Sequence, residues 1–216
     1  FHCDAEVVTE LALALQRGLN KGGMKSCGKH FPGHGFVEGD SHLTLPQDDR
    51  SLAELQAADM LPFKQLSSAG MAAVMPAHVV YSKVDSLPAG FSAKWLKQIL
   101  RQDIGFNGVI FSDDLTMEGA VSAGGIRERS KLAFEAGCDI VLVCNRPDLV
   151  DELREGFVMP ENPALAGRWQ YMANTLSTDE AAAMMQTAEF QAAQQLTAEL
   201  ATPKDVAGGV KVGEQF

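Results

Sequence analysis

Two spacings of apolar residues alternate along most of the chain. Stretches with an apolar residue at every third or fourth position predict amphipathic helices, and short continuous apolar runs between them predict strands. The predicted helices cover residues 4–19, 51–69, the stretch from Ser92 to Gly105, and 126–136. The predicted strands cover residues 24–28, 71–75, 108–111 and 140–143. This alternation is typical of parallel βα units, and the last run suits a strand buried on both faces.

Parallel βα units can build an open doubly wound sheet or a closed (β/α)8 barrel. A nucleotide-binding open sheet would carry a glycine-rich phosphate loop after a strand, and neither G-x-G-x-x-G nor G-x-x-x-x-G-K-[ST] occurs. Polar, reactive residues instead follow the predicted strands, at Lys29-His30, His78, Asp113-Asp114 and Asn145. Chemistry spread over several βα loops is typical of the carboxyl-terminal face of a barrel. The sequence therefore predicts an α/β fold of the TIM (β/α)8 barrel type.

Four of the eight units of a barrel can be counted in this chain. Residues 1–176 are predicted to form about the second half of a barrel, strands 5–8, with the first half expected upstream of Phe1. The Ala-, Gln- and Met-rich composition that follows predicts a helical segment over residues 177–201. Residues 202–216 lack periodicity and are expected to form a flexible tail. We therefore expect the chain, as about half of a barrel, to be an incomplete enzyme with poor activity on its own.

Composition argues against several classes of partner. The formal net charge is −10, which disfavours nucleic acid or an anionic membrane as the main partner. No apolar run approaches the roughly 18 to 20 residues of a membrane helix, and the start at Phe1 shows no signal peptide. The cysteines contain no C-x-x-C and lie far apart at Cys3, Cys27, Cys138 and Cys144. We expect reduced thiols in a cytoplasmic protein.

A segment rich in glycine and histidine carries the first candidate site. It reads KHFPGHG over residues 29–35 and continues with Asp40-Ser41-His42. Proline and glycine at this density predict a shaped loop rather than a helix. Three interpretations stay open: a structural polar loop, a metal site from His30, His34 and His42, and a catalytic pair. The metal spacing matches no common zinc motif. In the pair, Asp40 would fix the tautomer of His42, whose other ring nitrogen would then exchange protons.

A strand that ends in two acids carries the second candidate site. Residues 108–111 are followed by Ser112, Asp113 and Asp114. One interpretation is that Ser112 or Asp113 caps a helix. The other is that a carboxylate at the strand end acts as a nucleophile in the mouth of the barrel. Adjacent side chains in an extended chain point in opposite directions, so only one acid should face a substrate.

Taken together, these segments resemble glycoside hydrolase family 3, in its bacterial β-N-acetylhexosaminidase branch. The resemblance rests on KHFPGHG at 29–35, DSH at 40–42 and FSDDL at 111–115, in the order and spacing of the family. Met75-Pro76-Ala77-His78 and residues 136–145 add to it. It covers about residues 1–176.

The resemblance implies roles for five residues. Asp113 corresponds to the nucleophile, His42 to the general acid and base, and Asp40 to the residue that orients His42. Lys29 and His30 correspond to sugar-binding residues. The remaining histidines, His2 and His78, receive no role: the first is expected at the surface, and the second follows a strand and can line a pocket.

The resemblance also implies an activity: removal of terminal, non-reducing β-linked N-acetylglucosamine with retention, through a covalent glycosyl-enzyme intermediate. The implied substrate is the N-acetylglucosaminyl-anhydro-N-acetylmuramic acid fragment of peptidoglycan recycling, with or without peptide. The expected protein needs no cofactor or metal, acts in the cytoplasm, binds no nucleic acid or membrane, and is a monomer at full length. Two alternatives stay open: a family 3 phosphorylase, and an inactive sugar-binding remnant.

Overall fold

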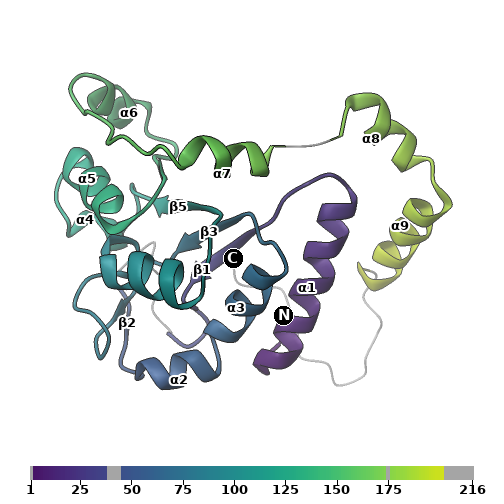
Figure 1. The fold of residues 1–216 in the computed structure, drawn as a ribbon, viewed down its shortest axis with the longest axis horizontal. Helices are drawn as coiled ribbons and strands as arrows, with labels where there is room; N and C mark the ends of the chain where they lie inside the picture. Colours follow the sequence, from purple (N-terminus) through teal and green to yellow (C-terminus); the bar gives the residue numbers. More distant parts are fainter. Residues whose placement is uncertain (1, 38–44, 174–175, 202–216) are drawn as a thin grey trace. The chain divides into compact units, whose positions relative to one another are not determined.

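A computed structural model describes residues 2–37, 45–173 and 176–201 of the chain (Figure 1). The chain divides into two compact units, Phe1–Asn174 and Thr175–Phe216. The elements of the first unit are α1 (Ala5–Lys21), β1 (Cys27–Phe31), β2 (Gln47–Asp48), α2 (Leu52–Ala57), α3 (Met60–Ser68), β3 (Ala73–Pro76), β4 (Val80–Tyr81), the 3-10 helix η1 (Ala89–Phe91), the π-helix η2 (Lys94–Asp103), β5 (Val109–Asp114), α4 (Glu118–Val121), α5 (Ile126–Ala136), β6 (Ile140–Leu142), α6 (Pro147–Arg154) and α7 (Leu165–Met172). The second unit contains α8 (Thr178–Met185) and α9 (Ala188–Ala201).

A four-stranded sheet forms the centre of the first unit, in the order β1-β3-β5-β6. Every neighbouring pair is parallel, with Gly28 opposite Val74 and Val74 opposite Ile110. Figure 1 shows β1, β3 and β5 side by side, with helices between successive strands. The predicted succession of parallel βα units is therefore confirmed. A second, two-stranded parallel sheet joins β2 to β4.

The first predicted strand is shifted along the chain. It runs over Cys27–Phe31 rather than residues 24–28, because the Met24 amide donates to Leu19 O and so belongs to the end of α1. Lys29 and His30 therefore lie within a strand, and the prediction that they follow it was wrong. Similarly, β5 extends beyond the predicted residue 111 to Asp114, whose register partner is Leu142.

The last strand differs from the prediction in burial. The residues of β6 are only partly buried, whereas an apolar run had suggested a strand buried on both faces. The physical reason is position: β6 is the outer strand of the described sheet, bonded on one side to β5.

The predicted helix over residues 51–69 is two helices. Ser51 and Glu54 form a reciprocal capping box at the start of α2. The helix ends before Ala58, and α3 begins at Met60. The segment 177–201 is likewise divided: Thr187 accepts a hydrogen bond from the Phe190 amide and starts α9. The helix over 126–136 matches the prediction and ends at Gly137, whose φ of 123° favours glycine.

The core lies between the sheet and its helices. Phe31, Tyr81 and Trp95 are fully buried and meet edge to face, with ring centroids 5.9 Å apart for Phe31–Trp95 and 5.1 Å for Tyr81–Trp95. Gly108 is needed where β5 approaches β3, because a Cβ there would lie 2.3 Å from Ala72 O. The predicted cap Ser92 lies two residues before η2, which begins at Lys94, and its Oγ accepts the Trp95 amide at 3.1 Å.

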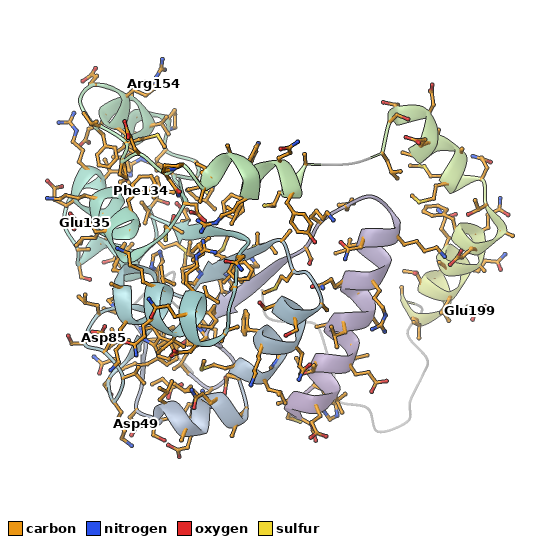
Figure 2. All side chains as sticks on the ribbon, viewed as in Figure 1. Asp49, Asp85, Phe134, Glu135, Arg154 and Glu199 are labelled. Carbon is orange, nitrogen blue, oxygen red and sulfur yellow. The ribbon has the colours of Figure 1, made fainter. Side chains whose placement is uncertain are left out.

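Outer helices are attached to this core by specific contacts. Gln16 of α1 donates from Nε2 to Ala69 O at 2.8 Å, which ties α1 to the end of α3, its neighbour in Figure 1. Phe134 of α5 stacks on Phe157 with ring centroids 5.9 Å apart, whereas Glu135 points outward (Figure 2). None of the described helices is both long and apolar enough to cross a bilayer.

Candidate active site

Three strands bring acids and histidines to one end of the sheet. His30 is the penultimate residue of β1, His78 follows β3, and Asp113 is the penultimate residue of β5. Because the strands are parallel, their carboxyl ends meet at the same edge. The sequence predicted this gathering, although it placed the residues in loops rather than partly within the strands.

Asp113 is the central group of this edge. Its residue is only 8% exposed. Oδ1 accepts the Asp114 amide at 2.8 Å, and Oδ2 lies 3.7 Å from His30 Nε2. One oxygen is thus held by the backbone, while the other has a neighbour beyond ordinary hydrogen-bond distance.

Asp114 has a different, structural task. Its carboxylate accepts the Thr116 amide at 3.0 Å, the Thr116 hydroxyl at 2.7 Å and the Cys144 amide at 3.0 Å. Burial acts to raise the pKa of Asp114, but these hydrogen bonds outweigh it and hold the pKa below its ordinary value. The expectation that only one of the two acids is available for chemistry agrees with these contacts.

The alternative of helix capping at this site is contradicted. Ser112 Oγ accepts the Leu142 amide at 2.9 Å, so Ser112 joins β5 to β6. Asp113 bonds the amide of the next strand residue rather than a helix start. The nearest helix, α4, begins at Glu118 without a side-chain cap.

Two imidazoles adjoin the acid. Burial lowers the pKa of His30, and the charge of Asp113 opposes this only in part. Burial also lowers the pKa of His78, again against the charge of Asp113. Both rings are therefore neutral near pH 7. His78 was given no role from the sequence, although its place after a strand was the feature that could have identified it.

Lys29 precedes His30 in β1 and is exposed. Together with His34, it lines a cavity of about 710 Å³ between α1, β1 and α3. Among the described residues, neither His30 nor Asp113 lines this cavity. Within the described residues, the structure places His30 Nε2 3.7 Å from Asp113 Oδ2 and shows no contact between Lys29 and Asp113.

An ion-pair cluster supports the turn after β1, and sequence analysis missed it. Arg50 donates to Asp48 from Nε at 3.1 Å and Nη2 at 2.7 Å, and from Nη1 to Asp59 at 2.6 Å. Its guanidinium carbon lies 4.1 Å from the centre of the Phe36 ring. A Cβ on Gly33 would lie 2.3 Å from Asp59 Cβ, so the turn packs directly against the cluster. We call Asp48, Arg50, Asp59 and Phe36 the Arg50 cluster.

Asp40 and His42 lie outside the described residues, and so does one member of the considered metal trio. Within residues 2–37, 45–173 and 176–201, no group of three His, Cys, Asp or Glu side chains could hold a metal ion. The rings of His30 and His34 stand 6.0 Å apart, edge to face. Of the free cysteines, Cys138 is buried as expected of a core residue and Cys144 only partly.

Comparison with known proteins identifies relatives along the whole chain. Residues 1–158 match the family described as Glycosyl hydrolase family 3 N terminal domain. A Beta-hexosaminidase of Neisseria meningitidis is 74% identical over 216 residues, which are 100% of this chain and 60% of that protein. The chain thus spans about 60% of the length of this curated relative.

Solved structures give the same result for the fold. NagZ from Neisseria gonorrhoeae in complex with N-trifluoroacetyl-D-glucosamine is 70% identical, with a TM-score of 0.87 over 94% of this chain and 58% of that chain. NagZ from the same bacterium in complex with zinc ion is 67% identical, with a TM-score of 0.86 over 94% and 57%. The predicted α/β fold of a family 3 barrel segment is confirmed.

Proposed function

Because the chain belongs to glycosyl hydrolase family 3, we propose that it carries the catalytic residues of a retaining β-N-acetylglucosaminidase. Asp113 is the nucleophile, His42 the general acid and base, and Asp40 the residue that orients His42. One observation carries this proposal: a mostly buried carboxylate at the end of a central strand has one oxygen bonded to an amide, and its other oxygen lies 3.7 Å from the His30 imidazole. A fixed, poorly solvated carboxylate suits attack on carbon.

The reaction proceeds in two displacements. Asp113 Oδ2 attacks the anomeric carbon while the bond to the leaving oxygen breaks, and His42 supplies the proton to that oxygen. Water then attacks the same carbon, gives its proton to His42, and releases the Asp113 carboxylate and β-N-acetylglucosamine. A histidine serves here because it is neutral after proton donation, so it places no second anion beside the glycosyl ester.

Sugar recognition divides between two places. His30, at 3.7 Å from Asp113, contacts the sugar that reacts. Lys29, an exposed residue that lines the cavity beside α1, is the second sugar-binding residue of this proposal. The NagZ structure with N-trifluoroacetyl-D-glucosamine supports an N-acylated glucosamine as the sugar class.

The physiological substrate is N-acetylglucosaminyl-anhydro-N-acetylmuramic acid, with or without peptide, in the cytoplasm. The full-length protein acts as a monomer without a cofactor. The formal net charge of −10 disfavours the binding of polyanions such as nucleic acid. Mass spectrometry of cytoplasmic muropeptides tests the substrate: deletion of the gene leads to accumulation of the uncleaved disaccharide, and unchanged levels contradict the assignment.

Replacement of the nucleophile tests the chemistry. In the protein expressed at the full length encoded by its gene, Asp113→Ala is expected to lower kcat by about 10⁴-fold or more, because the covalent route is lost. Binding of N-acetylglucosamine, measured by calorimetry, should persist. Normal turnover by folded Asp113→Ala protein would overturn the proposed function.

Replacement of the acid and base gives a second, separable result. His42→Ala is expected to lower kcat for a natural disaccharide by about 10²- to 10⁴-fold. It should lower kcat far less for a substrate with a good aryl leaving group. Equal effects on both substrates contradict the role of His42. Formation of N-acetylglucosamine 1-phosphate in phosphate buffer would indicate phosphorolysis instead. Activity that survives a strong chelator would exclude a metal-dependent reaction.

A further inference from the structure

Asp113 lies in a β-bulge, an irregularity of β5 that the proposed reaction has not explained. The register with β6 joins Phe111 to Ile140 and Asp114 to Leu142. Three steps along β5 therefore match two steps along β6, which gives β5 one extra residue between the two pairs. Such bulges bend a strand and change the direction of the side chains within it. Asp113 is one of the two residues that the bulge contains.

The bulge decides which of the two neighbouring acids is presented to the site. In an uninterrupted register Asp113 would stand opposite Leu142, the place that Asp114 takes instead. Because side chains alternate between the two faces of a strand, a shift of one residue exchanges the faces of the two acids. In the structure, Asp113 Oδ2 lies 3.7 Å from Nε2 of His30, which is on β1, two strands away. The Asp114 carboxylate instead bonds the Cys144 amide after β6.

Side chains before and after the nucleophile bond the bulged strand to its neighbour. Ser112 Oγ accepts the Leu142 amide at 2.9 Å, and Asp114 Oδ1 accepts the Cys144 amide at 3.0 Å. The residue Ser112 is only 1% exposed, so little water reaches its hydroxyl to replace it as the acceptor. The bulge is thus fastened to β6 by one side chain at each of its ends.

We propose that Ser112 is a positioning residue for Asp113. Its hydroxyl holds the bulge against β6, so that Asp113 rather than Asp114 faces the sugar. The proposal rests on the proposed function of Asp113. Asp114 also accepts the amide and the hydroxyl of Thr116, so its replacement would change several contacts at once. Replacement of Ser112 changes the fastening of the bulge more selectively.

Kinetics of the protein at the full length encoded by its gene test the proposal. Ser112→Ala removes the acceptor and should lower kcat by about 10- to 100-fold with KM within about threefold, because displacement of a reacting group by 1 Å costs about that much. The value of kcat/KM should fall by the same factor for a natural disaccharide and for a substrate with a good aryl leaving group, since Asp113 attacks both. Ser112→Thr keeps Oγ, and a β-branched residue suits a strand, so kcat should stay within about threefold of the wild type.

Ser130→Ala is the matched control. Ser130 of α5 is also fully buried, but among the described residues its Oγ has no hydrogen-bond partner. Its replacement should leave kcat unchanged. The proposal is wrong if Ser112→Ala keeps the kcat of the wild type per folded molecule, or if Ser112→Thr loses as much as Ser112→Ala. Where Ser112→Ala does not fold, Ser112→Cys fills the same space with a weak acceptor, and an undiminished kcat in that variant overturns the proposal equally.

Hydrogen exchange at the Leu142 amide, followed by nuclear magnetic resonance, does not depend on activity. Ser112→Ala should speed exchange of this amide by about two- to tenfold, and Ser130→Ala should leave it unchanged. Unchanged exchange in Ser112→Ala would mean that the hydroxyl does not fasten β5 to β6, and the proposal would fail even where kcat falls. Asp113→Ala separates the two ideas: if it is inactive while Ser112→Ala keeps full kcat, only the role of Ser112 fails, whereas turnover by Asp113→Ala contradicts the proposed function itself.

Discussion

Two buried aspartates at opposite ends of the sheet have contrasting surroundings. Asp139, just before β6, is 3% exposed and accepts from Arg101 and the Ile110 amide on Oδ2, and from Asn162 and Arg168 on Oδ1. Asp113, near the end of β5, is 8% exposed, and within the part of the chain that the structure describes its carboxylate accepts one hydrogen bond, from the adjacent amide.

This difference separates stability from chemistry. Asp139 compensates two arginines and connects α7 to the sheet, so every lone pair direction has a donor. Burial lowers the pKa of Arg101 to about 10, with the charge of Asp139 acting against it, which shows how poorly solvated this end is. Among the described residues, Oδ2 of Asp113 has no hydrogen-bond donor within ordinary distance. A carboxylate saturated by hydrogen bonds is a poor nucleophile, so the under-bonded acid is the one suited to react.

Replacement of Asp139 and of Asp113 by asparagine should give the largest difference in stability between the two ends of the sheet. Asp139→Asn leaves Arg101 and Arg168 without a buried counter-charge and should lower the free energy of unfolding by about 3–5 kcal/mol. Asp113→Asn keeps an Oδ1 acceptor for the Asp114 amide and should change it by less than about 1 kcal/mol. Urea denaturation of both variants measures these values.

The same pair should give the opposite order in activity. Asp113→Asn is expected to lose about 10⁴-fold in kcat, whereas the folded fraction of Asp139→Asn should turn over normally. If Asp139→Asn were as stable as the wild type, or if Asp113→Asn unfolded as readily as Asp139→Asn, the division of tasks would be wrong.

How far the sequence predicts this arrangement depends on the range of the interactions. Helical spacing predicted α5 to the residue, because an amphipathic period and a terminal Gly137 are local properties. The strand β1 was misplaced because its pairing with β3 depends on distant residues, and its polar Lys29 and His30 do not resemble a buried strand. Local patterns alone offered acids and histidines, and the family resemblance supplied their roles.

The contacts that distinguish Asp113 from Asp139 could not be predicted. Arg101 and Arg168 are 38 and 29 residues from Asp139 in the sequence, and no short sequence motif predicts contacts over such separations. The same holds for Arg50 and Asp59, which meet only because the predicted helix over 51–69 breaks between α2 and α3.

The Arg50 cluster sharpens the comparison, because it is a stabilising network near the reactive end. Arg50→Lys removes the forked contact with Asp48 and Asp59 and should lower the free energy of unfolding by about 2 kcal/mol. Phe36→Leu removes the ring under the guanidinium and should cost about 0.5–1 kcal/mol. Denaturant titration compares both with Lys131→Ala, whose exposed pair with Glu135 should contribute at most about 0.5 kcal/mol. If all three variants lowered the free energy of unfolding equally, the Arg50 cluster would have no special role in stability.

The smallest expected difference between the Asp113 end of the sheet and the Asp139 end lies in how the free energy of unfolding depends on pH. Burial lowers the pKa of His78 below its ordinary 6.5, so below about pH 7 the unfolded chain binds a proton that the folded chain does not. The free energy of unfolding must then fall as pH falls through the unfolded value, by at most about 1.4 kcal/mol per pH unit for each such proton. His78→Gln removes this titrating group and should flatten the slope between pH 7 and pH 5, measured by urea denaturation at each pH. Lys131→Ala should keep the slope of the wild type. An unchanged slope in His78→Gln would mean that the ring takes up its proton in the folded protein as readily as in the unfolded chain, and the reactive end would then be no more sensitive to acid than the rest of the sheet.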